Sequence, residues 1–237
     1  MKHYLNENIF IENEIFFYEE NEKIIKIKER DWHIYLSDYG WSKLNKKWIM
    51  KLNKLSKNKK KNSLFGCLDC GGDGDCLFHC ISYAMNDYKT TGTEKLRNDL
   101  AEYITEDKFR YIIEIYSALK ENDDFEETWD PNNLTLDKFK EIVKEGGDNY
   151  WGDFLILDLL KEYLDVNIVV LYNNEYTSEY YYYPTLHTYN NDKNTIILLY
   201  ENDIHFQLIG HFSIDRMNTL FNHSNIPEEI LSMVKLR

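Results

Sequence analysis

The sequence is short of cysteine, of proline and of long apolar runs. Its 237 residues include 4 cysteines and 3 prolines. The cysteines all fall within residues 67–80, whereas a disulfide framework spreads them along the chain, so we expect reduced thiols inside a cell. No apolar run approaches the roughly 18 residues of a membrane span, so we expect no contact with a membrane. Residues 1–7 have no apolar segment behind their charges, so we expect no secretion signal.

The chain also lacks an excess of basic residues. Its net charge of −13 argues against nucleic acid as a partner, because phosphate binding needs a basic surface. The charge is uneven, since residues 1–62 are net basic and residues 63–237 are strongly acidic. A solvated acidic face is the ordinary interpretation of such a bias, although an acidic cleft would also suit a basic peptide.

A basic run at residues 57–62 marks the predicted domain boundary. Such a run is typical of an exposed linker, and a basic contact site is the second interpretation. We therefore predict an N-terminal appendage over residues 1–62 and a main domain over residues 63–237. The chain length suits one medium domain with a small appendage. Within the appendage, short apolar clusters predict strands between residues 8 and 28, and a periodic apolar face predicts a helix from Ser42.

The main domain is predicted to have helices first and strands afterwards. Apolar periodicity predicts a helix after Cys76 and further helices over residues 139–145 and 154–164. Between them, Thr93 is the predicted N-cap of a helix with Leu96 on its apolar face, and Thr105 is the predicted N-cap of the next helix. Apolar or alternating runs predict strands over residues 168–171, 176–183, 195–200 and 204–209, and a last helix follows Pro227. This order favours an α+β domain with a central β-sheet flanked by helices.

Three of the ten glycines fall in one four-residue stretch, residues 71–74, directly before a predicted helix. Cys76 lies at the junction between this loop and the helix. The first-turn N–H groups of a helix are unpaired and its dipole is positive there, so a thiolate is favoured over a thiol. The same N–H groups can stabilise an oxyanion next to the sulfur. Cys76 is therefore a candidate nucleophile for acyl transfer.

A cysteine nucleophile needs a base, and His205 is the preferred candidate among the seven histidines. It begins a predicted strand after a tight polar turn, where a side chain is held more rigidly than on a loop. Taken by position alone, a histidine on a strand is usually a packing or surface residue. The remaining histidines lie in the appendage, on the helix of Cys76, or in loops and at a strand end: His3, His33, His79, His187, His211 and His223.

Three stretches of the sequence carry a family resemblance. Residues 73–78 have the sequence Asp-Gly-Asp-Cys-Leu-Phe, residues 150–152 are Tyr-Trp-Gly ahead of an apolar helix and an Ile/Val strand, and His205-Phe206 follows a hydrophobic strand. In this order they resemble the ovarian-tumour (OTU) family of cysteine proteases, whose signature is Asp-Gly-Asn-Cys-Leu-Phe. The resemblance spans about residues 64–212 and does not cover the first 60. It implies a papain-like OTU cysteine protease fold.

The resemblance also implies roles for individual residues. Cys76 would be the nucleophile, His205 the general base and Asp73 the signature aspartate. The loop from Asp73 to Cys76, with Gly74 and Asp75, would supply the oxyanion N–H groups. The family usually has Asp or Asn two residues after the histidine, and this chain has Gln207 there. The Gln207 carbonyl could still accept a hydrogen bond from the imidazole and orient it. Asp203 is the alternative orienting residue. Asp75 replaces the usual asparagine, and a carboxylate beside the sulfur tends to raise the thiol pKa.

The implied activity is that of a deubiquitinase. It would hydrolyse the isopeptide bond after the C-terminal glycine of ubiquitin through a thioester on Cys76, without a metal or another cofactor. The expected partners are ubiquitin, polyubiquitin or a ubiquitin-like modifier. We expect a cytoplasmic monomer, in the host cytoplasm if the source is a virus or a secreting microbe.

Two other interpretations stay open at this stage. Two cysteine pairs, Cys67 with Cys70 and Cys76 with Cys80, have the spacing of zinc ligands, but structural zinc sites usually have a longer excursion between the pairs. Alternatively, the chain has the same fold and binds ubiquitin without cutting it, which the Gln207 departure favours.

Overall fold

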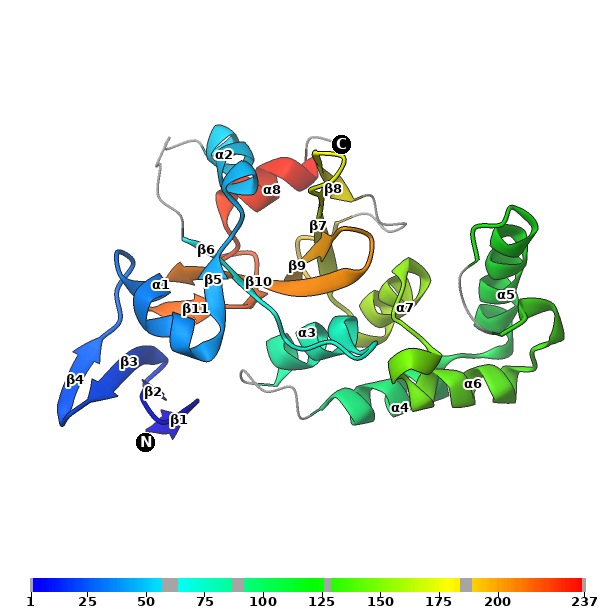
Figure 1. Ribbon diagram of the computed structural model, residues 1–237, viewed down its shortest axis with the longest axis horizontal. Helices are drawn as coiled ribbons and strands as arrows, with labels where there is room; N and C mark the ends of the chain where they lie inside the picture. The colour runs from blue at the N-terminus through cyan, green and yellow to red at the C-terminus, as the bar shows by residue number, and fades with distance from the viewer. Residues whose placement is uncertain (1, 57–63, 87–91, 126–128, 184–188, 236–237) are drawn as a thin grey trace. The chain divides into compact units, whose positions relative to one another are not determined.

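The computed structural model describes residues 2–56, 64–86, 92–125, 129–183 and 189–235 (Figure 1). The chain divides into two compact units. One joins Met1–Cys70 to Val166–Arg237 and holds the strands of the described residues; the other, Gly71–Asp165, is helical. The predicted α+β class is confirmed. The basic run at residues 57–62, and with it the predicted boundary, lies outside the described residues.

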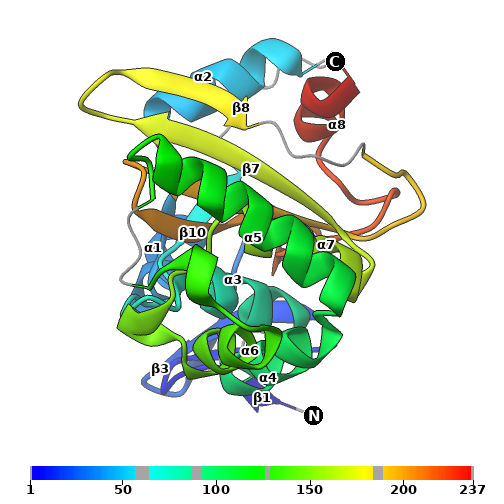
Figure 2. The same cartoon turned by 90° about the vertical axis from the view of Figure 1, so that its right-hand side faces the viewer.

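A mixed eight-stranded sheet forms the centre of the first unit. Its main path runs, in spatial order, through β5 (Trp41–Lys43), β6 (Phe65–Leu68), β10 (His205–Ser213), β9 (Thr195–Glu201), β7 (Asn167–Asn174) and β8 (Glu179–Tyr183). Strands β7 and β9 are parallel, and the other pairs are antiparallel. Two short strands complete the sheet: β11 (Arg216–Asn218) pairs with β10 and β12 (Leu220–Phe221) with β9. Figure 2 shows β7 and β8 as a long two-stranded ribbon.

The predicted N-terminal strands form a second, antiparallel sheet. It contains β1 (His3–Tyr4), β2 (Ile9–Glu12), β3 (Ile15–Glu20) and β4 (Lys23–Lys26) in sequence order. A short helix, α1 (Trp32–Tyr35), and a 3₁₀ turn, η1 (Leu36–Tyr39), follow. The predicted helix start at Ser42 was wrong. Residues 41–43 pair with β6 as β5, so the helix α2 (Lys46–Leu55) begins only after Asn45, whose side chain accepts from the N–H of Lys47.

The C-terminal helix α8 (Glu228–Lys235) packs against α2, and Figure 1 shows the two helices side by side. Together with one face of the sheet they form a hydrophobic core of the unit. Trp48 and Leu52 of α2, Ile230 of α8, and alternate residues of β7 and β9 contribute to it. Residues 41–55 are therefore part of the same core as the strands that follow residue 166.

Within its described residues, the helical unit contains five α-helices: α3 (Cys76–Met85), α4 (Thr93–Tyr103), α5 (Glu106–Glu121), α6 (Leu136–Glu145) and α7 (Phe154–Leu164). Short 3₁₀ turns η2 (Pro131–Asn133) and η3 (Gly147–Asn149) connect them. Helix α4 packs against α3, α6 and α7, and Figure 2 shows α4 and α6 running next to each other. The predicted N-cap at Thr105 is confirmed, since its hydroxyl accepts from the N–H of Lys108.

Two predicted details of these helices were wrong. Thr93 is the first residue of α4 rather than its cap, which is Gly92. On the same helix the apolar pattern placed Leu96 in the core, yet Leu96 is half-buried and the neighbouring Arg97 is only 2 % exposed. A buried arginine requires polar partners, and these partners belong to the candidate site.

Candidate functional site

The loop before α3 contains a left-handed backbone conformation that only glycine fits, at Gly74. Gly74 has a φ of 80°, and a Cβ there would lie 2.1 Å from the carbonyl oxygen of Gly147. Asp73 before it is also in the left-handed region, with a φ of 57°. The N–H of Asp75 donates to the carbonyl of Gly72 at 3.1 Å, so this predicted oxyanion donor is already used within the loop. The loop is therefore tightly turned where it enters the helix.

Cys76 is the first residue of α3, as the sequence predicts. It is 8 % exposed, and none of the four cysteines, all of which lie in the described residues, forms a disulfide. Helix α3 is buried around most of its circumference, including Leu77, Phe78 and Ile81, whereas Met85 at its end is exposed. The thiol thus lies at the N-terminus of a helix that is fixed by packing, at the positive end of the helix dipole.

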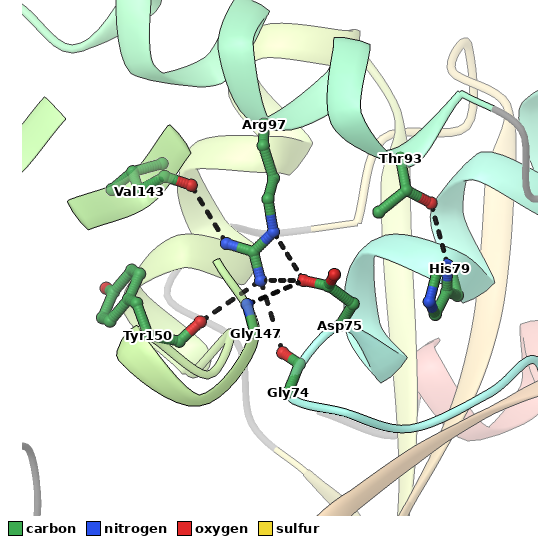
Figure 3. Close-up of polar contacts among 8 residues, drawn as sticks. All are labelled: Gly74, Asp75, His79, Thr93, Arg97, Val143, Gly147 and Tyr150. Atoms are coloured by element: carbon green, nitrogen blue, oxygen red, sulfur yellow. Dashed lines mark hydrogen bonds and ion pairs between the residues drawn. The ribbon is translucent and has the colours of Figure 1, made fainter. Parts of the chain in front are cut away.

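Asp75 is the N-cap residue of α3, but its side chain does not cap the helix. Its carboxylate points to Arg97, as Figure 3 shows: Oδ1 accepts from Nε of Arg97 at 2.6 Å and from the N–H of Gly147 at 3.4 Å. A second guanidinium nitrogen of Arg97 forms an ion pair with the same oxygen. The carboxylate that replaces the family's asparagine is therefore neutralised by an arginine that sequence reasoning missed.

Arg97 joins three segments of the helical unit. It donates to the carbonyls of Gly74 at 3.3 Å, of Val143 at 3.1 Å and of Tyr150 at 3.2 Å (Figure 3). Its guanidinium carbon also lies 3.8 Å from the centre of the Phe78 ring. Burial lowers the pKa of Arg97, and the charges of Asp75 and Cys76 oppose that shift. A guanidinium stays protonated at neutral pH, so a full positive charge lies beside the loop.

A buried hydroxyl network supports Tyr150 behind this arginine. The hydroxyls of Tyr150 and Tyr116 are hydrogen bonded, and that of Tyr116 donates to Oδ2 of Asp153 at 2.7 Å. The other oxygen of Asp153 caps α7 by accepting from the N–H of Ile156 at 3.0 Å. Burial raises the pKa values of both Tyr116 and Asp153. The Tyr-Trp-Gly block of the sequence thus fixes the carbonyl that Arg97 binds.

His79, on the same helix as Cys76, has a different partner. Its Nδ1 lies 2.9 Å from the hydroxyl oxygen of Thr93 (Figure 3). That contact joins α3 to the start of α4. We therefore assign His79 to the packing of the two helices.

His205 begins β10 in the sheet unit, as predicted, and its Nε2 lies 3.1 Å from Oδ1 of Asp69. The register explains the contact. Leu208 pairs with Leu68, so the chain that continues past Leu68 at the end of β6 runs alongside the start of β10. The imidazole is 25 % exposed and the carboxylate 63 % exposed. Asp69 was not among the predicted site residues, because it precedes Cys76 and only strand pairing places it next to His205.

Neither residue predicted to orient His205 makes that contact. Oε1 of Gln207 instead accepts from the thiol of Cys67 at 2.6 Å, and burial raises the pKa of that thiol. The carboxylate of Asp203 accepts from the hydroxyl of Tyr172 at 3.0 Å and from the amide of Asn174 at 2.9 Å. Asp69 is thus the acidic residue whose hydrogen bond to the imidazole the structure gives.

The described residues do not support the zinc interpretation. No group of three or more His, Cys, Asp or Glu side chains within them could hold a metal ion. The thiol of Cys67 is engaged with Gln207, and Cys80 is fully buried in α3. In the same part of the chain, no helix has the length and apolar character needed to cross a membrane.

Comparisons with known proteins agree with the motifs. The family model for OTU-like cysteine proteases matches residues 71–212, which is more than half of the chain. No curated protein matches the sequence. The match to the family model runs from the glycine loop through Cys76 and Arg97 to His205, and it confirms the resemblance seen in the sequence.

Solved OTU domains are similar at low identity. The OTU domain of OTUD1 is 14 % identical, with 78 % of this chain and 93 % of that chain covered and a TM-score of 0.43. The viral OTU domain protease from Farallon virus is 18 % identical, with 62 % and 85 % covered and a TM-score of 0.46. An OTU deubiquitinase from Wolbachia pipientis wMel, bound to ubiquitin, is 16 % identical, with 68 % and 98 % covered and a TM-score of 0.43. By its match to the family model, this chain belongs to the OTU-like cysteine proteases.

Proposed function

We propose that the protein is a thiol-dependent deubiquitinase that hydrolyses the isopeptide bond after the C-terminal glycine of ubiquitin. One observation carries the proposal. Cys76 begins a buried helix directly after a glycine-rich turn, and the carboxylate at the cap position is turned away to Arg97. A thiol in this position has the environment of an acyl-transfer nucleophile, with a positive helix end and a backbone that a substrate can approach.

The mechanism needs no metal. The thiolate of Cys76 attacks the carbonyl carbon of the terminal glycine, and backbone N–H groups at the start of α3 stabilise the oxyanion of the tetrahedral intermediate. The C–N bond then breaks, and protonated His205 gives its proton to the leaving lysine amine. Water, deprotonated by His205, attacks the resulting thioester, and the thiolate leaves. The imidazole therefore acts first as a general acid and then as a general base.

Asp69 supports this role of His205. When Nε2–H is donated to Asp69, Nδ1 is the unprotonated nitrogen of the neutral imidazole and the one that takes up a proton. The carboxylate also stabilises the imidazolium that forms during the reaction, which a neutral glutamine does less well. We therefore propose Asp69 as the orienting residue, in place of Gln207 or Asp203.

The test compares wild type with Cys76→Ala on a panel of ubiquitin dimers and on ubiquitin with a C-terminal electrophile. Wild type should cleave at least one dimer and be captured by the electrophile, and Cys76→Ala should do neither. Cys70→Ser is the matched control, because Cys70 is a nearby half-buried cysteine with no role in the mechanism. Normal capture of Cys76→Ala, or no capture and no cleavage by wild type, would contradict the proposal.

The same experiment tests the alternative function. A chain that binds ubiquitin but is not captured by the electrophile would be a binding module of the same fold. Capture by an electrophilic ubiquitin-like modifier, but not by ubiquitin, would keep the mechanism and change the substrate. Because the mechanism needs a reduced thiol, we propose the cytoplasm as the site of action.

A further inference from the structure

We propose that Arg97 is a positioning residue for Cys76: it holds the Asp75 carboxylate away from the first turn of α3, so that this turn stays available to the thiolate and the oxyanion. The inference rests on the proposed role of Cys76 as the nucleophile.

Other helices of this chain show what an N-cap side chain normally does. The side chains of the N-cap residues accept from first-turn N–H groups in α2, α5, α6 and α7, where these residues are Asn45, Thr105, Thr135 and Asp153. Asp153 is the direct comparison, because it is an aspartate before a helix of similar length, whereas Asp31, before the four-residue helix α1, makes no such bond. Asp75 occupies the same position in α3 without capping it. A capping carboxylate would use the N–H groups that a thiolate or an oxyanion needs.

The charge of Asp75 also matters for the neighbouring sulfur. An unpaired carboxylate one residue before Cys76 would disfavour the thiolate, because like charges repel. The ion pair with Arg97 cancels that charge, and the guanidinium is 2 % exposed, so water screens the interaction little. Asp75 therefore holds Arg97 in place, and Arg97 neutralises the negative charge that an aspartate at this position would otherwise place beside the thiolate.

Arg97 fits its surroundings closely. Its other donors bind the carbonyls of Gly74, Val143 and Tyr150, so the loop is fastened to two further segments of the unit. Gly146 has a φ of 60°, and a Cβ there would lie 2.4 Å from Nε of Arg97. The backbone at Gly146 thus lies directly against the guanidinium and leaves no room for a side chain. A lysine, with one ammonium group, could not serve the carboxylate and three carbonyls at once.

The test measures the rate of iodoacetamide reaction at Cys76 as a function of pH, with the modified cysteine located by fragmentation mass spectrometry. The reagent contains no ubiquitin, so the readout holds even if the chain cleaves no ubiquitin. The variants are Arg97→Gln, Asp75→Asn and the double variant. Arg110→Gln is the matched control, because Arg110 is exposed on α5 and pairs with Glu106 of the same helix.

Arg97→Gln should raise the pH midpoint of alkylation by about one unit and slow the reaction at pH 7 about tenfold, because Asp75 is released toward α3. The added Asp75→Asn change should restore most of the rate, and Arg110→Gln should match wild type. Asp75→Asn alone keeps the arginine, so it gives a readout even if Arg97→Gln does not fold, and it should lower the midpoint.

Two outcomes would overturn the proposal: an unchanged midpoint in Asp75→Asn, or a double variant as impaired as a folded Arg97→Gln. Either would mean that Arg97 only fills space in the helical unit. The proposed function fails separately. Wild type that cleaves no ubiquitin dimer, yet shows these shifts of the alkylation midpoint, would leave the role of Arg97 intact and change the substrate.

Discussion

At the scale of single residues, the hydrogen bond between Asp69 and His205 joins positions that are 136 residues apart in the sequence. The sequence-based candidates, Gln207 and Asp203, both lie two residues from the histidine. Residues two apart on a strand share a face, which made them plausible partners. The actual partner comes from the end of the neighbouring antiparallel strand, and no local pattern in the sequence reveals which strands are neighbours.

Asp69→Ala should lower kcat/KM for a ubiquitin substrate by about tenfold or more, because the imidazole loses its orienting acceptor. Asp69→Asn should have a smaller effect, since an amide oxygen still accepts from Nε2. Gln207→Ala is the comparison and should change the rate little, because Gln207 is bound to Cys67. A larger loss in Gln207→Ala than in Asp69→Ala, measured by steady-state cleavage, would return the orienting role to Gln207.

His211 gives a pH-dependent contribution to stability. Burial lowers its pKa to about 4, and its Nδ1 has no hydrogen-bond partner among the described residues. An unfolded histidine has a pKa near 6.5, so the unfolded chain binds the proton more readily. Stability should therefore be complete above about pH 6.5 and decrease as the pH falls toward 4, by about 3 kcal/mol in total.

The measurement is urea unfolding of wild type and His211→Gln between pH 4 and pH 8. The variant should be less stable at pH 8 and should lose less stability on acidification than wild type does. His223→Gln serves as the control, because His223 is exposed and should leave the wild-type slope unchanged. An equal slope in His211→Gln and wild type would show that other groups cause the acid sensitivity.

At the scale of elements, the glycine loop leads directly into helix α3. The two glycines Gly72 and Gly74 of this loop differ in what an added side chain would meet, so substitutions at them should have different effects. Gly74→Ala should abolish most activity and destabilise the chain, because its φ is 80° and its Cβ would meet a backbone oxygen. Gly72→Ala should have little effect on stability, since a Cβ there meets no atom within 4 Å. Thermal unfolding and the cleavage rate of both variants check this; similar losses in the two would contradict it.

The sequence predicted most helices and strands because their apolar periodicity matches their burial. Helix α7 begins and ends where the sequence predicted, and Asp165 closes it in the left-handed conformation. The predictions that were wrong have a common cause, which is a contact with a residue distant in the sequence. Strand β5 replaced a predicted helical turn because β6 pairs with it, and Arg97 replaced Leu96 in the interior because Asp75 and three carbonyls pair with it.

At the scale of the whole molecule, family membership was predictable because three motifs in one order are specific. The catalytic candidates within those motifs, Cys76 and His205, follow from the same resemblance. The supporting residues, Arg97 and Asp69, lie outside the motifs, and only the contacts within each unit identify them. Long-range contacts of this kind depend on the complete fold rather than on local sequence.

The predicted division at residue 62 can be tested by truncation. A fragment of residues 63–237 lacks β5 and α2, and with them the buried Trp48 and Leu52. Burial of one large apolar side chain contributes about 1.5–3 kcal/mol, so these two alone represent much of a typical domain stability. We expect this fragment to unfold at a lower urea concentration than the full chain, or to aggregate.

A fragment of residues 30–237 is the comparison, since it keeps β5, α2 and the core around Trp48 and loses the N-terminal four-stranded sheet. Because Phe10 and Phe16 of that sheet are buried, this fragment should unfold at a urea concentration between those of the shorter fragment and the full chain. If residues 63–237 instead unfolded at the same urea concentration as the full chain, residues 1–62 would be a dispensable appendage, as the sequence predicts.

The arrangement of strands in the sheet also has a consequence for the order of events during synthesis. Strand β6 pairs with β10, so β6 cannot join the sheet at Leu68 until Leu208 has left the ribosome. Residues 71–165 form a continuous helical unit and can fold earlier. The loop before Cys76 can therefore form while the strand β10, which begins at His205, has not yet been synthesised. If the proposed mechanism holds, the nascent chain cannot cleave a substrate until its last third, which contains His205, has been made.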